Sequence, residues 1–425
     1  MPGKVVTFYP GPLRGSVRVP GDKSISHRAL IAGARAAEPL RIANLNPGED
    51  VGATREALLA LGVGIEAQGA ELIVAGGRLH LPNATLDCMN SGSTARMLLG
   101  ACAGAGVRAR FDGDASLRRR PMEPVAAQLR AFGARIATTH GRLPVDLSGT
   151  PRIETRHFIL LAPSAQVKSA LLFAALFAGV AVRIDGDRGS RDHTERMIRY
   201  LGGEIEWGER SIRLESACIR GGAIEVAGDF SAAAFFITAA AITKDSAICV
   251  RGSGVNPTRT GLLEALSAMG ASIELRNPRT VSGEPIADIA VEYRPLAAAN
   301  IGADIALRAI DEIPLLAIAA AFAAGTTTIA GVGDLRTKES DRVAAIGRLL
   351  DAVGIQATSE RQRLTISGGR PAPRSAIIDT AGDHRIAMAA AVLACAAGPL
   401  AADSDASVAV SFPGFLPALQ SLRGA

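Results

Sequence analysis

Residues 21–24 read Gly21-Asp22-Lys23-Ser24, and this polar stretch leads directly into a run rich in alanine and leucine. The same combination, a polar or glycine-containing opening followed by an apolar helical run, recurs along the chain. Its copies begin at residues 21, 90, 163, 228, 311 and 382. A spacing of roughly 70 residues is typical of an internally repeated supersecondary unit. We therefore predict six repeats that together fill the chain.

A second pattern lies between these openings, where a helix ends at glycine and a β-branched strand follows. Glycine just past a helix end adopts the left-handed conformation without a Cβ penalty. The copies are residues 61–65, 132–136, 201–205 and 269–273, with a looser copy at 353–355. Each repeat is thus expected to contain strands, one apolar helix with a polar start and one more amphipathic helix, which is an α/β architecture.

Length and composition restrict the class of protein. A chain of 425 residues is too long for one hydrophobic core, so two or three domains are expected. The net charge of +5 is spread along the chain and only 4% of the residues are aromatic, which argues against a nucleic-acid partner. Five cysteines without C-x-x-C spacing argue against a zinc site and suit a reducing cytoplasm. The longest apolar run, of about 17 residues, is too short to span a membrane.

The apolar helices should be buried, with unpaired N–H groups and a partial positive charge at their N-termini. For a single opening, capping by Ser or Asp is the simpler interpretation. Six similar openings, several followed by Lys or Arg, favour a shared anion site. Lys23, Ser24 and Arg28 suit such a site, because a basic first turn is unfavourable unless an anion accompanies it.

Other charged stretches do not by themselves indicate a functional site. Residues 338–342, Lys-Glu-Ser-Asp-Arg, would usually form a solvated helix turn, and the pair Asp311-Glu312 would usually cap a helix. The basic residues 118–120 would form either a solvated loop or a nucleic-acid patch. Their recurrence at equivalent points of the repeats is what favours a functional role.

Together, these motifs resemble those of the 3-phosphoshikimate 1-carboxyvinyltransferases, or EPSP synthases, and they occur in the family's order. They are G-D-K-S-I-S-H-R, N-S-G-S-T-A-R, R-R-P, S-A-Q-V-K-S-A, R-D-H-T-E, D-E-I-P, K-E-S-D-R and G-D-H-R-I-A-M, between about Lys23 and Pro413. The R-D-H-T-E motif resembles a bacterial branch of the family. The resemblance implies an enolpyruvyl transferase-like inside-out α/β barrel fold of two domains, each of three βαβαββ repeats, with the active site in the interdomain cleft. The first domain would comprise residues 21–228, and the second residues 1–20 with 229–425.

The resemblance also implies a reaction and its binding residues. The family joins shikimate 3-phosphate, through its 5-hydroxyl, to phosphoenolpyruvate and releases phosphate, a step of aromatic amino-acid biosynthesis. The residues implied to hold shikimate 3-phosphate are Ser24, Arg28, Ser164, Ala165, Gln166 and Arg191. Those implied to surround phosphoenolpyruvate are Lys23, Gly92, Arg120, Arg342 and Arg385. Fixed cations would offset the repulsion between two anionic substrates.

The family pattern assigns the proton transfers to two carboxylates. Asp311, with Lys338 close to it, would take the proton from the 5-hydroxyl, and Glu339, sharing the task with Lys23, would protonate the phosphoenolpyruvate methylene. The intermediate then loses phosphate by C–O cleavage, so no metal ion or other cofactor is expected. The expected partners are the two small substrates, with no nucleic acid and no membrane, and the protein is expected to be a monomer.

Three positions limit what the resemblance implies. Val410 stands where the family's other main branch has a Lys, and Asp334 stands where an Asn often precedes the Lys-Glu motif. For glyphosate, a candidate inhibitor, Gly92 predicts room and therefore sensitivity, whereas the R-D-H-T-E motif accompanies tolerance in the branch that this chain resembles. The sequence leaves this conflict open.

Two other interpretations compete with this one. The UDP-N-acetylglucosamine carboxyvinyltransferases share the repeated fold but carry a reactive cysteine in a mobile loop, and the corresponding residues 118–124 contain none. A non-catalytic basic scaffold that binds nucleic acid would be expected to lose Asp311, Glu339 or the arginines, yet all are present. Within residues 118–120, the resemblance implies that Arg120 faces the ligand and the other two arginines face solvent.

Overall fold

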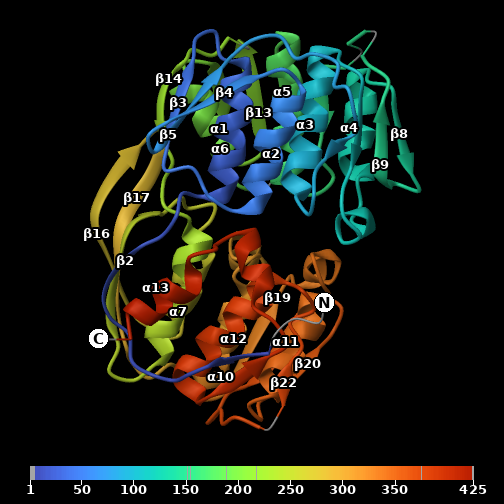
Figure 1. The fold of residues 1–425 in the computed structure, drawn as a ribbon. Helices are drawn as coiled ribbons and strands as arrows, with labels where there is room; N and C mark the ends of the chain where they lie inside the picture. The colour runs from blue at the N-terminus through green and yellow to red at the C-terminus, as the bar shows by residue number, and fades with distance from the viewer. Residues whose placement is uncertain are drawn as a thin grey trace. The chain divides into compact units, whose positions relative to one another are not determined.

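The chain forms two compact units in the computed structural model, which describes residues 5–150, 152–153, 155–187, 189–216, 218–374 and 376–423 (Figure 1). Unit 1 comprises Met1–Pro20, Gly228–Arg279 and Pro285–Ala425, and unit 2 comprises Gly21–Ala227 and Thr280–Glu284. The chain therefore passes between the units after Pro20, Ala227, Arg279 and Glu284. The last two crossings enclose a short segment that the sequence analysis did not anticipate.

An apolar helix begins at each of the six predicted openings, which confirms that expectation. They are α1 (Lys23–Arg35), α3 (Gly92–Ala105) and α5 (Ala165–Ala178) in unit 2, and α7 (Phe230–Ile242), α10 (Ile313–Phe322) and α12 (His384–Ala397) in unit 1. Five of them start with an Asp or Ser side chain that accepts a backbone N–H bond. The sixth, α10, carries a proline in its first turn instead.

The helix–glycine–strand pattern is confirmed as well. The second helices are α2 (Glu49–Ala60), α4 (Glu123–Phe132), α6 (His193–Tyr200), α8 (Gly261–Ala268) and α11 (Arg342–Asp351). Glycines with positive φ, at positions 62, 133, 202, 270 and 354, follow them closely. The strands that come next are β4 (Gly64–Gln68), β8 (Ile136–Thr139), β12 (Glu204–Trp207), β16 (Ser272–Val281) and β20 (Gln356–Ser359).

Three sheets are each built from one continuous βαβαββ segment. In the first, β6 (Leu86–Asp87) runs parallel to β7 (Ala109–Asp112), and β7 and β8 run antiparallel to β9 (Arg142–Leu147), in the order β6-β7-β9-β8. The same order recurs as β10-β11-β13-β12 and β18-β19-β21-β20. Their remaining strands are β10 (His157–Ile159), β11 (Val182–Asp185), β13 (Ser211–Ser216), β18 (Asn300–Ile301), β19 (Thr326–Ala330) and β21 (Arg363–Ser367).

The other three sheets each take a strand from a distant part of the chain. In unit 2, β14 (Gly222–Glu225) pairs in parallel with β3 (Leu40–Ala43), which is followed by β5 (Glu71–Ala75) and β4. In unit 1, β2 (Arg14–Arg18) pairs in parallel with β15 (Ala247–Gly254), next to β17 (Glu284–Glu292) and β16. The last sheet joins β1 (Val6–Phe8) to β23 (Leu400–Ala402) and β22 (Ile377–Ile378). Strands β1 and β2 thus complete two repeats of unit 1.

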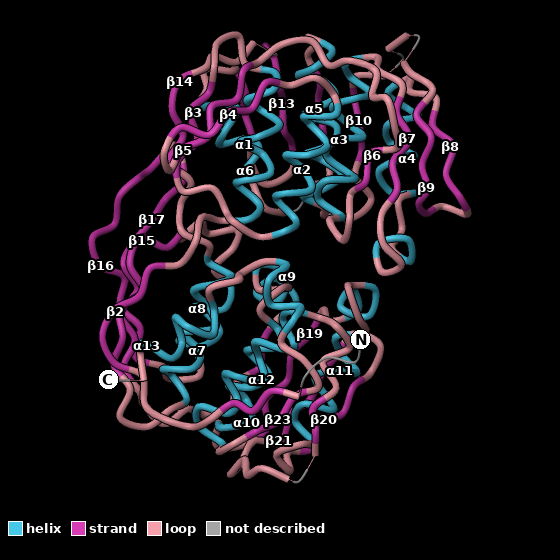
Figure 2. The backbone as a smooth tube through the Cα atoms, viewed as in Figure 1, coloured by secondary structure: helices cyan, strands magenta, loops and turns pink. Residues whose placement is uncertain are grey.

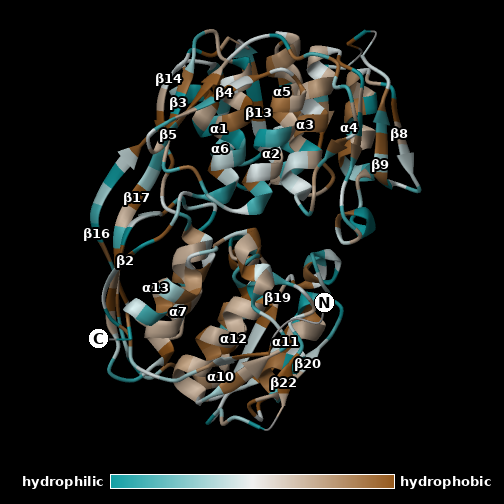
Figure 3. Cartoon of the chain, viewed as in Figure 1, coloured by the Kyte–Doolittle hydropathy of each residue, from teal (hydrophilic) through white to brown (hydrophobic). Residues whose placement is uncertain are grey.

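The core of each unit is made of the apolar helices, with strands on the outside. In unit 2, Figure 2 shows helices between the strands β3–β5 and β7–β9, and in unit 1 α7, α10 and α12 are hydrophobic over most of their length (Figure 3). Helices α3 and α5 approach closely because Gly100 and Gly104 have no Cβ, which would overlap the carbonyl groups of Ala170 and Ala174. The α/β fold of repeated units is therefore confirmed.

The remaining helices are short: α9 (Ala303–Arg308), α13 (Phe415–Ser421) and the 3₁₀ turns η1 (Leu117–Arg119), η2 (Gly333–Thr337) and η3 (Ala406–Val410). Among the helices in the described part of the chain, none has the length and apolar character needed to cross a membrane.

Candidate active site

The residues predicted to form the site fall into two groups, one in each unit. Unit 2 contains Lys23, Ser24, Arg28, Gly92, Arg120, Ser164, Ala165, Gln166 and Arg191, and unit 1 contains Asp311, Lys338, Glu339, Arg342 and Arg385. Within each group, most of these residues lie at or just before the first turns of helices, as the sequence pattern predicts.

In unit 2, Lys23 is the first residue of α1 and forms an ion pair with a carboxylate of the neighbouring helix. Its Nζ lies 2.6 Å from Oδ2 of Asp50 on α2, and both side chains are largely buried. Asp22 caps α1 by accepting a hydrogen bond from the backbone N–H of Ile25. The basic first turn is thus accompanied by an anion from within the protein, which offsets its unfavourable interaction with the helix dipole.

Arg28, one turn further along α1, is held in one orientation by three hydrogen bonds. Its Nε donates to Oγ1 of Thr194 at 2.7 Å, its Nη2 to Oγ of Ser169 at 2.9 Å, and its Nη1 to the carbonyl of Ser24 at 2.8 Å. Burial lowers the pKa of Arg28 to about 10, against the opposing charge of Glu195, so the guanidinium remains a cation at neutral pH. Thr194 and Ser169 lie inside the R-D-H-T-E and S-A-Q-V-K-S-A motifs, so one role of these motifs is to supply the hydroxyl groups that orient Arg28.

The N-terminus of α5 is linked to α3 by a glutamine. Ser164 caps α5, and Ala165 is the first residue of the helix. The next residue, Gln166, accepts a hydrogen bond from Nη1 of Arg96 at 2.9 Å and donates to Oγ of Ser93 at 3.2 Å. The sequence analysis missed Arg96, although it is the last residue of the quoted N-S-G-S-T-A-R motif.

Gly92 starts α3 directly beside two arginines. A Cβ at this position would overlap the guanidinium of Arg96 and lie 3.3 Å from Nη1 of Arg120. Arg120 is held by Asn90, whose side-chain and backbone oxygens accept hydrogen bonds at 2.7 and 3.3 Å. Residues 118 and 119 are exposed, which agrees with the prediction that they face solvent, and Arg120 is partly buried.

The loop before α6, which carries Arg191, is fastened by a buried ion triad. Nζ of Lys168 lies 2.7 Å from Oδ2 of Asp187 and 2.8 Å from Oε1 of Glu195, and donates to the carbonyl of Ser190 at 3.0 Å. Burial opposes the charge on Lys168, but the two carboxylates outweigh it and raise its pKa. Arg191 itself is partly exposed, and its charge is close enough to act on Arg28.

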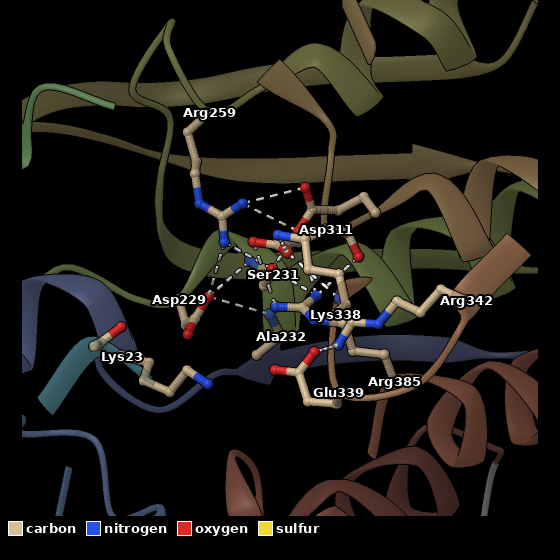
Figure 4. A network of polar contacts seen from close by, with 12 residues as sticks. Lys23, Asp229, Ser231, Ala232, Arg259, Asp311, Lys338, Glu339, Arg342 and Arg385 are labelled. Carbon is tan, nitrogen blue, oxygen red and sulfur yellow. Dashed lines mark hydrogen bonds and ion pairs between the residues drawn. The ribbon is translucent and has the colours of Figure 1, made fainter. Parts of the chain in front are cut away.

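In unit 1, three cationic side chains surround the carboxylate of Asp311 (Figure 4). Oδ1 lies 3.5 Å from Nζ of Lys338 and 3.5 Å from Nη1 of Arg342, and Oδ2 lies 3.9 Å from Nη2 of Arg385. The pairing of Asp311 with Lys338 that the motifs predicted is present. Three cations stabilise the ionised carboxylate, which is the form that a general base requires.

Arg342 links that carboxylate to two others. It is fully buried, its Nη2 lies 2.6 Å from Oε2 of Glu339, and its Nε lies 2.8 Å from Oδ2 of Asp383, the N-cap of α12. Burial works against the charge of Arg342, but Asp383, Glu339 and Asp311 outweigh it and raise its pKa. Glu339 remains partly exposed, so a proton can reach it.

Behind these residues lies a buried cluster that the sequence analysis did not identify as part of the site. Nη1 of Arg259 contacts both carboxylate oxygens of Glu312 at 3.1 and 3.2 Å, and its Nη2 donates to Oγ of Ser231 at 2.7 Å. Ser231 also hydrogen-bonds to Glu312 and accepts from Nη1 of Arg385 at 3.0 Å. Glu312 and Ser231 lie in the openings that begin at residues 311 and 228, but no motif singled out Arg259.

Among the described residues, there is no cluster of three or more His, Cys, Asp or Glu side chains that could hold a metal ion. The two groups instead offer fixed cations for phosphate and carboxylate groups, together with carboxylates placed beside them for proton transfer.

Comparison with known proteins gives a consistent result. The family model described as EPSP synthase (3-phosphoshikimate 1-carboxyvinyltransferase) matches residues 9–419. A protein named 3-phosphoshikimate 1-carboxyvinyltransferase from Anaeromyxobacter sp. (strain Fw109-5) is 44% identical, covering 99% of each chain, and one from Thermosynechococcus vestitus is 43% identical, covering 97% of this chain and 96% of the relative. A solved EPSP synthase from Acinetobacter baumannii superposes with a TM-score of 0.86 at 37% identity over 98% of both chains. The enolpyruvyl transferase NikO from Streptomyces tendae, at 19% identity and a TM-score of 0.78, shares the fold.

Proposed function

Because the chain belongs to the EPSP synthase (3-phosphoshikimate 1-carboxyvinyltransferase) family, we propose that the two groups of residues bind the substrates of that reaction and catalyse it. The enzyme transfers the carboxyvinyl group of phosphoenolpyruvate to the 5-hydroxyl of shikimate 3-phosphate and releases phosphate. Units 1 and 2 are the two domains of the family fold in this proposal. Neither alternative from the sequence, the UDP-N-acetylglucosamine enzyme or the non-catalytic scaffold, is favoured by the comparisons.

Unit 2 supplies the binding residues for shikimate 3-phosphate in this proposal. Arg28 and Arg191 provide positive charge for the phosphate, and Ser164 provides a hydroxyl at a helix N-terminus. Gln166 lies against the ring. This role is supported by the fixed orientation of Arg28 and Gln166, whose hydrogen bonds to neighbouring helices remove the cost of ordering them when substrate binds.

Unit 1 supplies the proton transfers, and the observation that carries this part is the carboxylate of Asp311 among three cations. Asp311 accepts the proton of the 5-hydroxyl, and Lys338 stabilises the negative charge that passes from the carboxylate to the 5-oxygen. The deprotonated 5-oxygen forms a bond to C2 of phosphoenolpyruvate, and Glu339 donates a proton to the methylene carbon, which becomes a methyl group in the tetrahedral intermediate. Arg342 and Arg385, with Lys23 and Arg120 from unit 2, neutralise the phosphate and carboxylate of phosphoenolpyruvate. Loss of a proton from the methyl group and of phosphate from the same intermediate then restores the double bond.

The first experiment measures phosphate release from phosphoenolpyruvate with shikimate 3-phosphate or UDP-N-acetylglucosamine as the acceptor. The wild type should release phosphate only when shikimate 3-phosphate is the acceptor, and the Asp311→Ala variant should lose that activity. Release by the variant at the wild-type rate would move the base elsewhere, with Lys338 the next candidate. No release with either acceptor would contradict the proposed function itself.

A further inference from the structure

The tip of the β16–β17 hairpin belongs to a different unit from the strands that carry it. Strand β17 pairs with β15 inside the sheet of unit 1, with β16 at the edge of that sheet. Residues Thr280–Glu284 nevertheless group with unit 2. The turn at Ser282 and Gly283 has φ values of +48° and +82°, which are those of the tight two-residue turn that suits twisted hairpins.

Three contacts fasten this tip to unit 2. Oγ of Ser282 accepts a hydrogen bond from the backbone N–H of Glu225 at 2.9 Å, and the carbonyl of Gly283 accepts one from Nη1 of Arg196 at 3.4 Å. Gly283 also packs directly on α6, since a Cβ there would lie 3.2 Å from the carbonyl oxygen of Arg196. The third contact is the pair between Glu284 and His193, the first residue of α6, at 2.8 Å.

The pair of His193 and Glu284 is almost fully buried, with side chains 2% and 6% exposed. Within the described structure, Nε2 of His193 is buried and has no hydrogen-bond partner. A neutral imidazole with its proton on Nδ1 leaves no donor unpaired, and the carboxylate of Glu284 accepts that proton's hydrogen bond. Removing the carboxylate would leave a buried N–H without a partner, which is costly enough to reorient the ring or the first turn of α6.

That first turn is part of the candidate binding site. Thr194, the residue after His193, accepts the hydrogen bond of Arg28 and shares another with Ser169. The charge of Glu284 is also close enough to act on Arg28. We propose that Glu284 is a positioning residue for shikimate 3-phosphate: through His193 it fixes the start of α6, and through Thr194 the orientation of Arg28. This inference rests on the proposed function of Arg28.

The test compares Glu284→Ala with Glu284→Gln, because a glutamine oxygen accepts the same hydrogen bond without the charge. Asp288→Ala is the matched control, since Asp288 lies on the same strand but bonds to Gly252 and Asn277 of unit 1. The readouts are KM for each substrate and the calorimetric Kd for shikimate 3-phosphate. We expect Glu284→Ala to raise KM and Kd for shikimate 3-phosphate about tenfold. KM for phosphoenolpyruvate should change less than about twofold, and Glu284→Gln and Asp288→Ala should stay close to the wild type.

A merely structural role would lower the melting temperature and the active fraction, neither of which alters KM or Kd. An unchanged Kd in Glu284→Ala, an equal rise of both KM values, or an equal defect in Glu284→Gln would each overturn the positioning role, while an active wild type would leave the proposed function standing. A wild type that releases no phosphate with shikimate 3-phosphate would overturn both.

Discussion

Replacing Asp311 with asparagine removes the negative charge and the basicity of this side chain while keeping its size. The charge lies within 4.0 Å of Lys338, Arg342 and Arg385. Arg342 keeps its contacts with two other carboxylates, and Arg385 keeps its hydrogen bonds to Ser231 and to the backbone carbonyl of residue 311. The two arginines should therefore stay in place, so the variant tests the chemistry of the carboxylate rather than the fold.

The size of the effect follows from the role assigned to Asp311. A positioned general base contributes about 10²- to 10⁴-fold to a rate, which corresponds to about 2.7–5.4 kcal/mol of activation free energy. We expect kcat to fall within that range. KM for phosphoenolpyruvate should not rise, because the substitution removes a carboxylate that competes with substrate anions for Arg342 and Arg385.

Steady-state phosphate release, with each substrate varied in turn, measures both quantities. Asp304→Asn is the matched control, because Asp304 also lies in unit 1 but is 78% exposed and forms only a loose ion pair with Arg308, at 3.8 Å. It should leave kcat within about twofold of the wild type. A loss in Asp311→Asn of less than about tenfold, or a loss that comes only from KM, would refute Asp311 as the base.

Three further predictions concern other parts of the molecule. Arg120→Ala should raise KM for phosphoenolpyruvate far more than Arg119→Ala, because Arg119 is exposed; equal effects in steady-state kinetics would contradict the assignment. Gly92→Ala should displace the guanidinium of Arg96 and raise KM for phosphoenolpyruvate, and an unchanged KM would count against this contact. Burial lowers the pKa of His27 from 6.5 to about 3. As the pH falls, His27 therefore takes up a proton in the unfolded chain before it does so in the folded one. The free energy of unfolding should then drop by about 1.6 kcal/mol between pH 6.5 and 5, and denaturant titrations of His27→Gln should show a smaller drop.

The helices could be predicted from the sequence because the features that define them are local. An aspartate or serine cap, an apolar run and a terminal glycine lie within about 20 residues of one another, and their repetition strengthened each assignment. No comparable local sequence feature indicates which strands pair with each other. Pairing β14 with β3 joins residues 222–225 to residues 40–43, and the parallel partner of β15 comes from residues 14–18. Such pairings depend on the packing of the whole unit.

A contact of the candidate site could be predicted from the sequence only where both of its residues lie in the same motif. Glu339 and Arg342 lie three residues apart in one motif, and their side chains do form an ion pair, although residues 338–341 precede α11 and do not form the helical turn that the sequence suggested. Arg259 was missed because it lies outside every motif and reaches Glu312 only through the tertiary fold. Lys168 and Glu195 were present in quoted motifs, but nothing in the sequence indicates that a lysine of one motif pairs with a glutamate of another.

The repeats explain how helix starts of one kind can form a site that is both basic and stable. A cation at a helix N-terminus opposes the helix dipole, so it needs a nearby anion. At α1, Lys23 follows a capping aspartate and pairs with Asp50, and at α12, Arg385 follows a capping aspartate and lies beside Asp311. Where an opening has no cation, as at α7, Arg259 reaches it from another segment. The same local arrangement, repeated with variations, thus supplies the cations and the neighbouring carboxylates to which we assign substrate binding and proton transfer.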